Sequence, residues 1–308
     1  MIVISRRVGR LGNRLLLFAH FIGAAEEHGL TVCNPAFGTY AHLFPSTASD
    51  LLCRYPQRGA FPAPGGSRDL IYAAARLASE GLSLLQRRGV DTGLLRLQGG
   101  EHLDLNGDVF LDAVGRHRVV VADGWFFRNA DNCIRHRETI CRFLTPGREH
   151  LDRALAVVEP ARGRGRLVIG VHVRRGDYAT FKNGRYYYSF EQYRRVMEGA
   201  AAAFGDRDVA FLVCSDEPVP ADAFAGLDVV LGAGDALTDL YSLAACDRLV
   251  GPLSTYSTWA SYWGGVPLYR IEDPDRVPSD RLFRTRLELS RGLLGRLPQP
   301  PDAPPGPG

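Results

Sequence analysis

The sequence contains no long hydrophobic run. No apolar stretch approaches the roughly 20 residues that a membrane-spanning helix requires. Residues 1–5 (MIVIS) are too short and wrongly flanked for a signal peptide. We therefore expect a cytoplasmic protein without stable membrane insertion, which meets any lipid-linked substrate only through peripheral contact.

Cysteine pairs of the CxxC type are also missing. The six cysteines are Cys33, Cys53, Cys133, Cys141, Cys214 and Cys246, and their spacing fits no zinc site. Most of them lie in apolar segments, as Cys214 does at the end of VAFLVC. Buried, reduced thiols are the simplest interpretation, and they agree with a cytoplasmic location.

A strong net charge of either sign is absent. The formal charge is +3, which is too small to indicate a nucleic-acid-binding protein. Lys182 is the only lysine among 37 basic residues. Guanidinium groups favour bidentate contacts with phosphate, although a GC-rich coding sequence would explain the excess of arginine equally well.

The composition that is present is typical of a globular enzyme with about two domains, since 45% of the 308 residues are hydrophobic and 23% are charged. The first half opens with a β-branched strand, a glycine-bearing turn and an apolar helix, the order of a nucleotide-binding α/β domain. The expected elements are a strand at 2–4, a turn at 9–13, a helix at 15–25 that stops at Gly29, strands at 30–33 and 119–122, and a helix at 130–144. Residues 34–118 predict only a loop and one or two helices.

The second half predicts a second α/β domain. A Gly- and Arg-rich linker at 160–166 precedes the apolar run 167–173, which is typical of a parallel strand buried on both faces. The further expected elements are a helix from a capping box at 189–192 to Gly205, strands at 209–214, 248–251 and 266–271, and helices at 239–246 and 255–263. We therefore expect domains at 1–160 and 161–290, followed by a Pro-rich tail at 291–308 without regular structure.

The sharpest chemical signal is VHVRRGDY at residues 171–178, directly after the apolar run. Two adjacent arginines at a strand end are costly to bury unless an anion meets them, and each charge-assisted bond to phosphate contributes about 1.5–3 kcal/mol. Neighbouring residues point to opposite sides of a strand, so Arg174 and Arg175 should differ in role. The alternative is that one arginine pairs with a carboxylate such as Asp177 while the other is solvated.

Residues 172–178 resemble the HxRxxD-type motif of α1,2-, α1,6- and protein O-fucosyltransferases, and are most similar to α1,2-fucosyltransferases of bacteria and animals. Three further stretches resemble the same family in the same order: GRLGN at 9–13, DGWF at 123–126, and DLY at 239–241 together with STYSTW at 254–259. Ser215 and Asp216 fall where the family carries an SDD strand end. The resemblance covers residues 1–270, poorly so over 34–118.

This resemblance implies an α/β fold of the GT-B type, with two Rossmann-like domains that face a cleft. It implies inverting, metal-independent transfer of fucose from GDP-fucose to a glycan hydroxyl, with GDP-fucose held mainly by the C-terminal domain and the N-terminal domain on the acceptor side. The implied acceptor is a bacterial surface polysaccharide or a lipid-linked oligosaccharide. The implied substrate-binding residues are Gly9, Arg10, Gly12, His172, Arg174, Arg175, Ser215, Asp216, Asp239, Ser254, Thr255, Tyr256 and Ser257.

The implied catalytic residues are Arg174, Asp177 and Asn13. Arg174 would neutralise charge on the departing GDP, the role that a metal fills elsewhere. Asn13 would orient the acceptor hydroxyl or the fucose, or would simply be the N-cap of the first helix. Asp177 is the candidate base, with Asp123 and Glu191 as alternatives.

Other patterns favour structural interpretations. The Asp-x-Asp strings at 206–208 and 273–275 are typical of solvated turns rather than metal sites. The rings of residues 186–188 would either stack on a sugar or pack in the core. Arg14, Leu253 and Thr258 depart from the family pattern and leave linkage and acceptor open.

Three rival functions remain. They are a transferase that uses another nucleotide sugar, a non-catalytic nucleotide- or glycan-binding relative, and a dinucleotide-dependent oxidoreductase. The last is disfavoured, because the first loop is not GxGxxG and no acidic residue ends the second strand.

Overall fold

The computed structural model describes residues 1–283 except 60, 63, 164–165 and 277. By its internal contacts the chain forms two compact units, which divide between Pro146 and Gly147. We expected the division at 160–161. It falls earlier because the helix α7 (Arg148–Arg162) makes many contacts with α9 (Ala236–Ala244) of the second unit. The Pro-rich tail at 291–308 lies outside the described residues.

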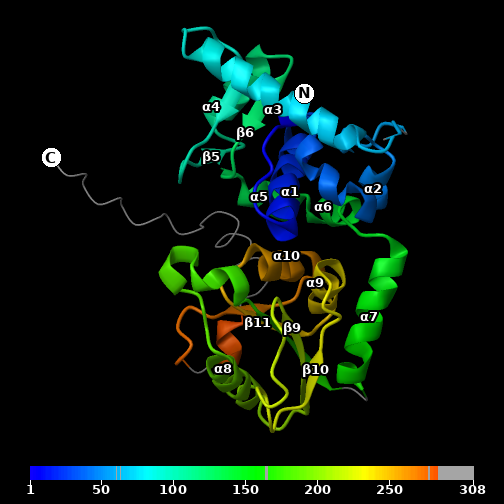
Figure 1. The fold of residues 1–308 in the computed structure, drawn as a ribbon, viewed down its shortest axis with the longest axis vertical. Coiled ribbons are helices and arrows are strands. Elements are labelled where there is room, and N and C mark those ends of the chain that lie inside the picture. The colour runs from blue at the N-terminus through cyan, green and yellow to red at the C-terminus, as the bar shows by residue number, and fades with distance from the viewer. Residues whose placement is uncertain (60, 63, 164–165, 277, 284–308) are drawn as a thin grey trace, which may run out of the picture. The chain divides into compact units, whose positions relative to one another are not determined.

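Unit 1 is built on a five-stranded sheet in the order β3-β2-β1-β6-β4. Its strands are β1 (Ile2–Ile4), β2 (Val32–Cys33), β3 (Arg54–Tyr55), β4 (Leu94–Arg96) and β6 (Val120–Asp123), with β5 (Leu103–Asp104) and β7 (Phe127–Arg128) paired separately. Its helices are α1 (Leu11–His28), η1 (Pro35–Leu43), α2 (Pro45–Ala48), α3 (Ser67–Gln86), α4 (Asp108–Arg116), α5 (Ala130–Arg135) and α6 (Arg137–Phe143) (Figure 1). All the pairings in the main sheet are parallel except that of β3 with β2.

The predicted start of this unit is confirmed. β1 is followed by the helix α1, which ends at Gly29 in the left-handed conformation with φ 64°. A glycine is needed there because other residues rarely adopt a positive φ. The expected single helix at 130–144 is instead two helices, since the backbone leaves the helical region at His136.

The interpretation of 34–118 was incomplete. This segment contains the 20-residue helix α3, the shorter η1, α2 and α4, and also the strands β3, β4 and β5. Strands of two or three residues carry no alternating pattern that a sequence could reveal. β4 nevertheless forms an edge of the main sheet, through its parallel pairing with β6.

Unit 2 is built on a parallel five-stranded sheet in the order β10-β9-β8-β11-β12. Its strands are β8 (Leu167–Val173), β9 (Val209–Ser215), β10 (Val229–Leu231), β11 (Arg248–Gly251) and β12 (Leu268–Arg270). Its helices are α7, η2 (Gly176–Ala179), η3 (Phe181–Gly184), α8 (Phe190–Ala202), α9, α10 (Thr255–Gly264) and η4 (Asp280–Leu282). The chain leaves β8 in one direction to β9 and later returns on its other side as β11, so the topological switch point lies at β8.

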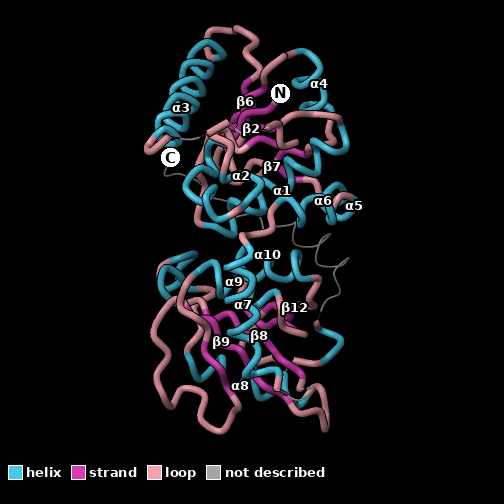
Figure 2. Tube along the Cα trace, turned by 90° about the vertical axis from the view of Figure 1, so that its right-hand side faces the viewer, coloured by secondary structure: helices cyan, strands magenta, loops and turns pink. Residues whose placement is uncertain are grey.

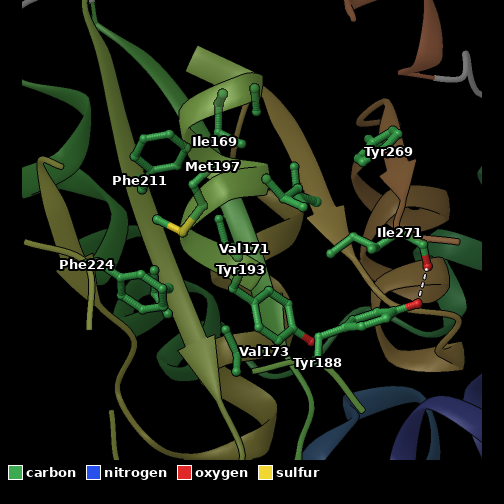
Figure 3. Close-up of a cluster of buried hydrophobic side chains, with 14 of the residues drawn as sticks. Ile169, Val171, Val173, Tyr188, Tyr193, Met197, Phe211, Phe224, Tyr269 and Ile271 are labelled. Carbon is green, nitrogen blue, oxygen red and sulfur yellow. Dashed lines mark hydrogen bonds between the residues drawn. The ribbon is translucent and has the colours of Figure 1, made fainter. Parts of the chain in front are cut away.

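The two faces of β8 are covered by different helices. On one face, Ile169, Val171 and Val173 pack against Tyr193 and Met197 of α8 (Figure 3). On the other face, Gly170 lies so close to α9 and β11 that a Cβ there would come within 3 Å of side chains from both. β8 is therefore fully buried, as the apolar run predicted.

Two sequence predictions for unit 2 have clear outcomes. The linker expected at 160–166 is in part helical, because α7 continues through Pro160 to Arg162, and residues 164–165 are not described. The capping box of α8 is confirmed: the Ser189 side chain accepts from the Gln192 N–H, and the Gln192 side chain accepts from the Ser189 N–H.

None of the six cysteines forms a disulfide, and all but Cys141 are buried, as predicted. Within the described ranges, no helix has both the length and the apolar character needed to cross a membrane.

Candidate functional site

Three strands of unit 2 end at one edge of the sheet and bring predicted site residues together. Arg174 and Arg175 follow β8, Asp216 follows β9, and Ser254 follows β11. Because β8 pairs with both β9 and β11 in parallel, the carboxyl ends of all three strands meet at the switch point. This edge is where open α/β sheets bind ligands.

Arg174 is held by carboxylates at this edge. Its Nη2 lies 2.7 and 2.9 Å from the two oxygens of Asp177, and its Nε lies 3.3 Å from Oδ2 of Asp216. Its guanidinium also lies 5.4 Å from the ring centre of Tyr178, and 16% of its side chain is exposed. The arginine is thus fixed by two acidic neighbours while part of its surface can still meet an anion.

Arg175 has a different environment, as expected, although both arginines lie beyond β8, which ends at Val173. Its guanidinium lies 4.5 Å from the ring centres of both Tyr187 and Phe190. It also bonds Glu217 at 3.0 Å, the carbonyl of Tyr188 at 2.8 Å and the hydroxyl of Tyr187. With this many partners within the chain, Arg175 fastens the loop, and it is not the solvated member of the pair.

Asp216 organises the turn after β8. Its Oδ1 accepts hydrogen bonds from the main-chain N–H groups of Arg175 at 2.8 Å and Gly176 at 3.4 Å. Ser215 is bound in the same corner, where its hydroxyl accepts from the N–H of Glu217. A Cβ at Gly176 would lie 3.0 Å from Asp216 Oδ2, so a glycine permits the close approach of the two loops.

The helix α10 begins at the same edge. Ser254 is its N-cap, and its side chain accepts from the N–H of Tyr256. The hydroxyl of Ser257 is buried and donates to the carbonyl of Ser254, so it is directed into the chain in this structure. Thr255 opens the first turn, where the positive end of the helix dipole favours anions.

His172 and Asp239 lie on the α9 and α10 side of β8 and are both buried. The ring centres of His172 and Tyr256 are 4.8 Å apart, and Nδ1 of His172 has no hydrogen-bond partner in the described part of the chain. Burial, reinforced by the charge of Arg174, lowers the pKa of His172 to about 3, so the ring is neutral. Burial raises the pKa of Asp239 to about 6, although the Ala233 and Gly234 N–H groups bond its carboxylate.

The predicted residues of unit 1 form one turn between β1 and α1. Gly9 has φ +58°, and a Cβ on it would lie 2.0 Å from Nδ2 of Asn13. α1 begins at Leu11, so Arg10 is the N-cap and Asn13 lies inside the first turn. The interpretation of Asn13 as the cap is therefore wrong. Arg10 is exposed, and Gly12 is buried in α1.

The other candidate carboxylates have structural partners. Asp123 is 1% exposed and contacts Arg76 at 3.0 Å, Arg96 at 2.9 Å and the hydroxyl of Ser79 at 2.9 Å. Glu191 lies in the first turn of α8 and pairs with Arg194 on the surface. Both carboxylates therefore have arginine partners within their own units.

The Asp-x-Asp strings form turns whose acids bond within the chain, such as Asp208 with Arg166 and Asp275 with Arg195. Among the described residues, no group of three or more His, Cys, Asp or Glu side chains is arranged to hold a metal ion. Of the tyrosine run, Tyr186 and Tyr188 are buried, whereas Tyr187 is the partner of Arg175.

Two residues that position the arginines were missed in the sequence. The hydroxyl of Tyr193, inside α8, accepts from the Arg174 N–H at 3.1 Å, and the hydroxyl of Tyr178 donates to the Leu253 carbonyl at 2.7 Å. Tyr193 carries no local signal, because it contacts the motif only through tertiary packing. Tyr178 is part of the motif and could have been suspected from that alone.

The chain is similar in sequence or in fold to known glycosyltransferases. Residues 153–276 match the sequence model of glycosyl transferase family 11. The fold is similar to that of Arabidopsis thaliana FUT1 solved with GDP, with a TM-score of 0.59, 15% identity, and coverage of 91% of this chain and 71% of FUT1. It is also similar to the fucosyltransferase NodZ from Bradyrhizobium, with a TM-score of 0.53, 20% identity, and coverage of 90% and 97%.

The resemblance to fucosyltransferases is confirmed. A third similar structure, POFUT1 in complex with GDP-fucose, has a TM-score of 0.53, 14% identity, and coverage of 90% of this chain and 96% of POFUT1. At these identities the structures show a shared fold, so the predicted α/β fold class with GT-B-like fucosyltransferase neighbours is confirmed. No curated protein sequence matches the chain.

Proposed function

We propose that this protein transfers fucose from GDP-fucose to a hydroxyl of a glycan acceptor, with inversion, without a metal and with α1,2 linkage. The observation that carries the proposal is the edge of the unit 2 sheet, where Arg174 and the start of α10 follow the neighbouring parallel strands β8 and β11. A cationic side chain and a helix N-terminus together suit a diphosphate. GDP or GDP-fucose in the structures of FUT1, NodZ and POFUT1 supports the choice of donor.

The proposed chemistry needs charge neutralisation at the leaving group. The bond between fucose C1 and the β-phosphate oxygen breaks, the acceptor oxygen bonds to C1 from the opposite face, and GDP departs with the bonding electrons. Arg174 stabilises the negative charge that grows on GDP. Arg175, Asp216 and Tyr193 fix the loop that carries Arg174, and this fixed loop avoids reorganisation during the reaction.

The remaining predicted residues receive roles in the same proposal. His172 and Asp239 recognise the nucleoside, with the Asp239 carboxylate accepting from guanine or ribose. Asp177, half exposed beside Arg174, takes the proton of the acceptor hydroxyl. In unit 1, the turn at 9–13 contributes to the acceptor side, with Asn13 orienting a hydroxyl.

Calorimetric binding of GDP, UDP and ADP, with EDTA or with Mg²⁺, tests the donor half of the proposal. We expect GDP to bind best and to be indifferent to Mg²⁺. Arg174→Ala should weaken GDP binding by roughly 10- to 150-fold, which corresponds to the loss of a charge-assisted bond of about 1.5–3 kcal/mol. Arg207→Ala, a change at an exposed arginine in the turn before β9, is the matched control and should leave the affinity unchanged.

Preferred binding of UDP or ADP, or binding that requires Mg²⁺, would contradict the proposal. Turnover of GDP-fucose against GDP-mannose with galactoside acceptors then tests the sugar, and NMR of the product gives linkage and anomeric configuration. Asp177→Asn should lower kcat while GDP affinity stays within a few-fold. An unchanged kcat in that variant would exclude Asp177 as the base.

A further inference from the structure

The fully buried positions of the helix α3 are polar. Its only buried residues are Ser79 and Ser83. The same side also carries Arg76, which contacts Asp123, and Arg68, which donates to the carbonyls of Thr47 and Ala48. An amphipathic helix at the surface of a globular protein ordinarily turns its apolar side inward. In α3 the inward side carries the half-buried Ile71, Tyr72, Ala75 and Leu82, but a second apolar stripe lies on the opposite side.

The apolar side of α3 faces outward. Leu70, Leu77, Leu84 and Leu85 are 74%, 74%, 60% and 44% exposed. At 3.6 residues per turn, Leu70 and Leu84 lie within about 20° of the line through Leu77. Small residues widen this stripe, namely Ala73, Ala74, Ala78 and Gly81, all exposed. In Figure 2, α3 lies at the margin of unit 1, with the strands of the sheet on one side of it only.

The charged residues around this surface leave a net positive charge at the C-terminal end of α3. Asp69 is paired with Arg7 at 2.6 Å, and Glu80 is paired with Arg76 at 2.6 Å and with Arg96 at 3.0 Å. Arg87 and Arg88, just beyond the helix, are exposed and have no ion pair within the described part of the chain. The acidic charges are therefore neutralised within unit 1, while two cations remain available to a partner.

We propose that this outward side of α3, the α3 face (residues 70, 73, 74, 77, 78, 81, 84 and 85), docks on an anionic membrane surface. The exposed apolar arc spans about 140°, which is wider than the narrow seam by which one helix pairs with another. A wide apolar arc suits a helix lying at the lipid interface, and the free arginines suit anionic headgroups. The face lies outside the proposed nucleotide site, so the two proposals fail or stand separately.

Co-sedimentation of the full chain with lipid vesicles tests the docking. Vesicles of phosphatidylcholine containing phosphatidylglycerol should bind the wild type, and pure phosphatidylcholine vesicles should bind it less. Leu70→Asp with Leu77→Asp should lower the partition coefficient at least tenfold, since each leucine would lose burial of about 1.5–3 kcal/mol. Leu155→Asp is the matched control, because Leu155 is an exposed leucine of α7, in unit 2.

A second test examines the contribution of the arginines to vesicle binding. Arg87→Gln with Arg88→Gln should lower binding to the anionic vesicles roughly 10- to 30-fold, from about 1 kcal/mol for each arginine near the surface. The control pair is Arg148→Gln with Arg207→Gln, two exposed arginines of unit 2. All these changes are at exposed positions, so thermal unfolding and GDP affinity should match the wild type and thereby exclude misfolding.

Two results would overturn the proposal. One is failure of the wild type to bind anionic vesicles, or equal losses in the α3 face variant and the Leu155→Asp control. The other is a concentration-dependent dimer in sedimentation velocity that Leu70→Asp with Leu77→Asp abolishes, without vesicle binding. That second outcome would assign the α3 face to a second copy of the chain.

Discussion

At the scale of single residues, Arg174 and Arg175 show how neighbours in sequence acquire different tasks. Arg175 lies between two aromatic rings and bonds Glu217, so its charge is used within the fold. Arg174 is held by Asp177 and Asp216 at the end of the strand. A guanidinium held by carboxylates keeps its position without a ligand, and this readiness is what a leaving-group site requires.

Asp239 gives a prediction on pH. Its pKa is raised to about 6 by burial, so the carboxyl is ionised above this pH and protonated below it. If the carboxylate accepts bonds from GDP, affinity should fall as the pH drops through 6, because a neutral acid is the weaker acceptor. Between pH 7.5 and 5, we expect a loss of GDP affinity about tenfold greater in the wild type than in Asp239→Asn, measured by calorimetry.

Asp239→Asn is a suitable control, because the amide oxygen can still accept from the Ala233 N–H. Because the substituted amide does not titrate, any pH dependence that remains in the variant comes from other groups, such as the GDP phosphate. Its affinity should be weaker than that of the wild type at pH 7.5 and should approach it at pH 5. Parallel pH profiles for the two proteins would show that Asp239 does not contact the nucleotide.

At the scale of elements, prediction from sequence succeeded where a segment is buried on both faces. The limits of β8 and β11 agree with the strands predicted at 167–173 and 248–251. Prediction failed for the segment 34–118, since the edge strands β3 and β4 are defined by their partners rather than by their own residues. α3 was also difficult to interpret, because four of its five leucines are exposed while its two buried residues are serines.

Two glycines in helices should respond in opposite ways to alanine. A Cβ at Gly264 of α10 would lie 2.1 Å from the carbonyl oxygen of Ala244, where α10 packs on α9. Main chain cannot yield as a side chain can, so Gly264→Ala should destabilise unit 2 by about 1–3 kcal/mol. A Cβ at Gly81 of α3 would meet no atom within 4 Å.

Gly81→Ala should therefore stabilise unit 1 by about 0.5–1 kcal/mol, through the better helix propensity of alanine. Urea unfolding of both variants against the wild type measures the two effects. If both variants are destabilised, the outer side of α3 is covered in solution. The α3 face would then not be available to a membrane.

At the scale of the whole molecule, the sequence predicted two α/β domains and the order of their motifs, and it could not predict how distant side chains meet. The motif at 172–178 has a local signature, but Tyr193 and Glu217 reach it from α8 and from the end of β9. The boundary between units was predicted too late in the chain for the same reason, since the packing of α7 on α9 leaves no mark in the sequence.

The last prediction concerns the two compact units, of which unit 2 carries the proposed nucleotide site. We expect differential scanning calorimetry to resolve two transitions, of which GDP shifts only that of unit 2. At 100 times the Kd, GDP should stabilise this unit by about 2.7 kcal/mol, which raises its Tm by on the order of 10 °C. Arg174→Ala should remove the shift and leave the unit 1 transition in place. A single transition that moves as a whole would show that the units unfold together, and a shift confined to the unit 1 transition would place the nucleotide on the wrong sheet.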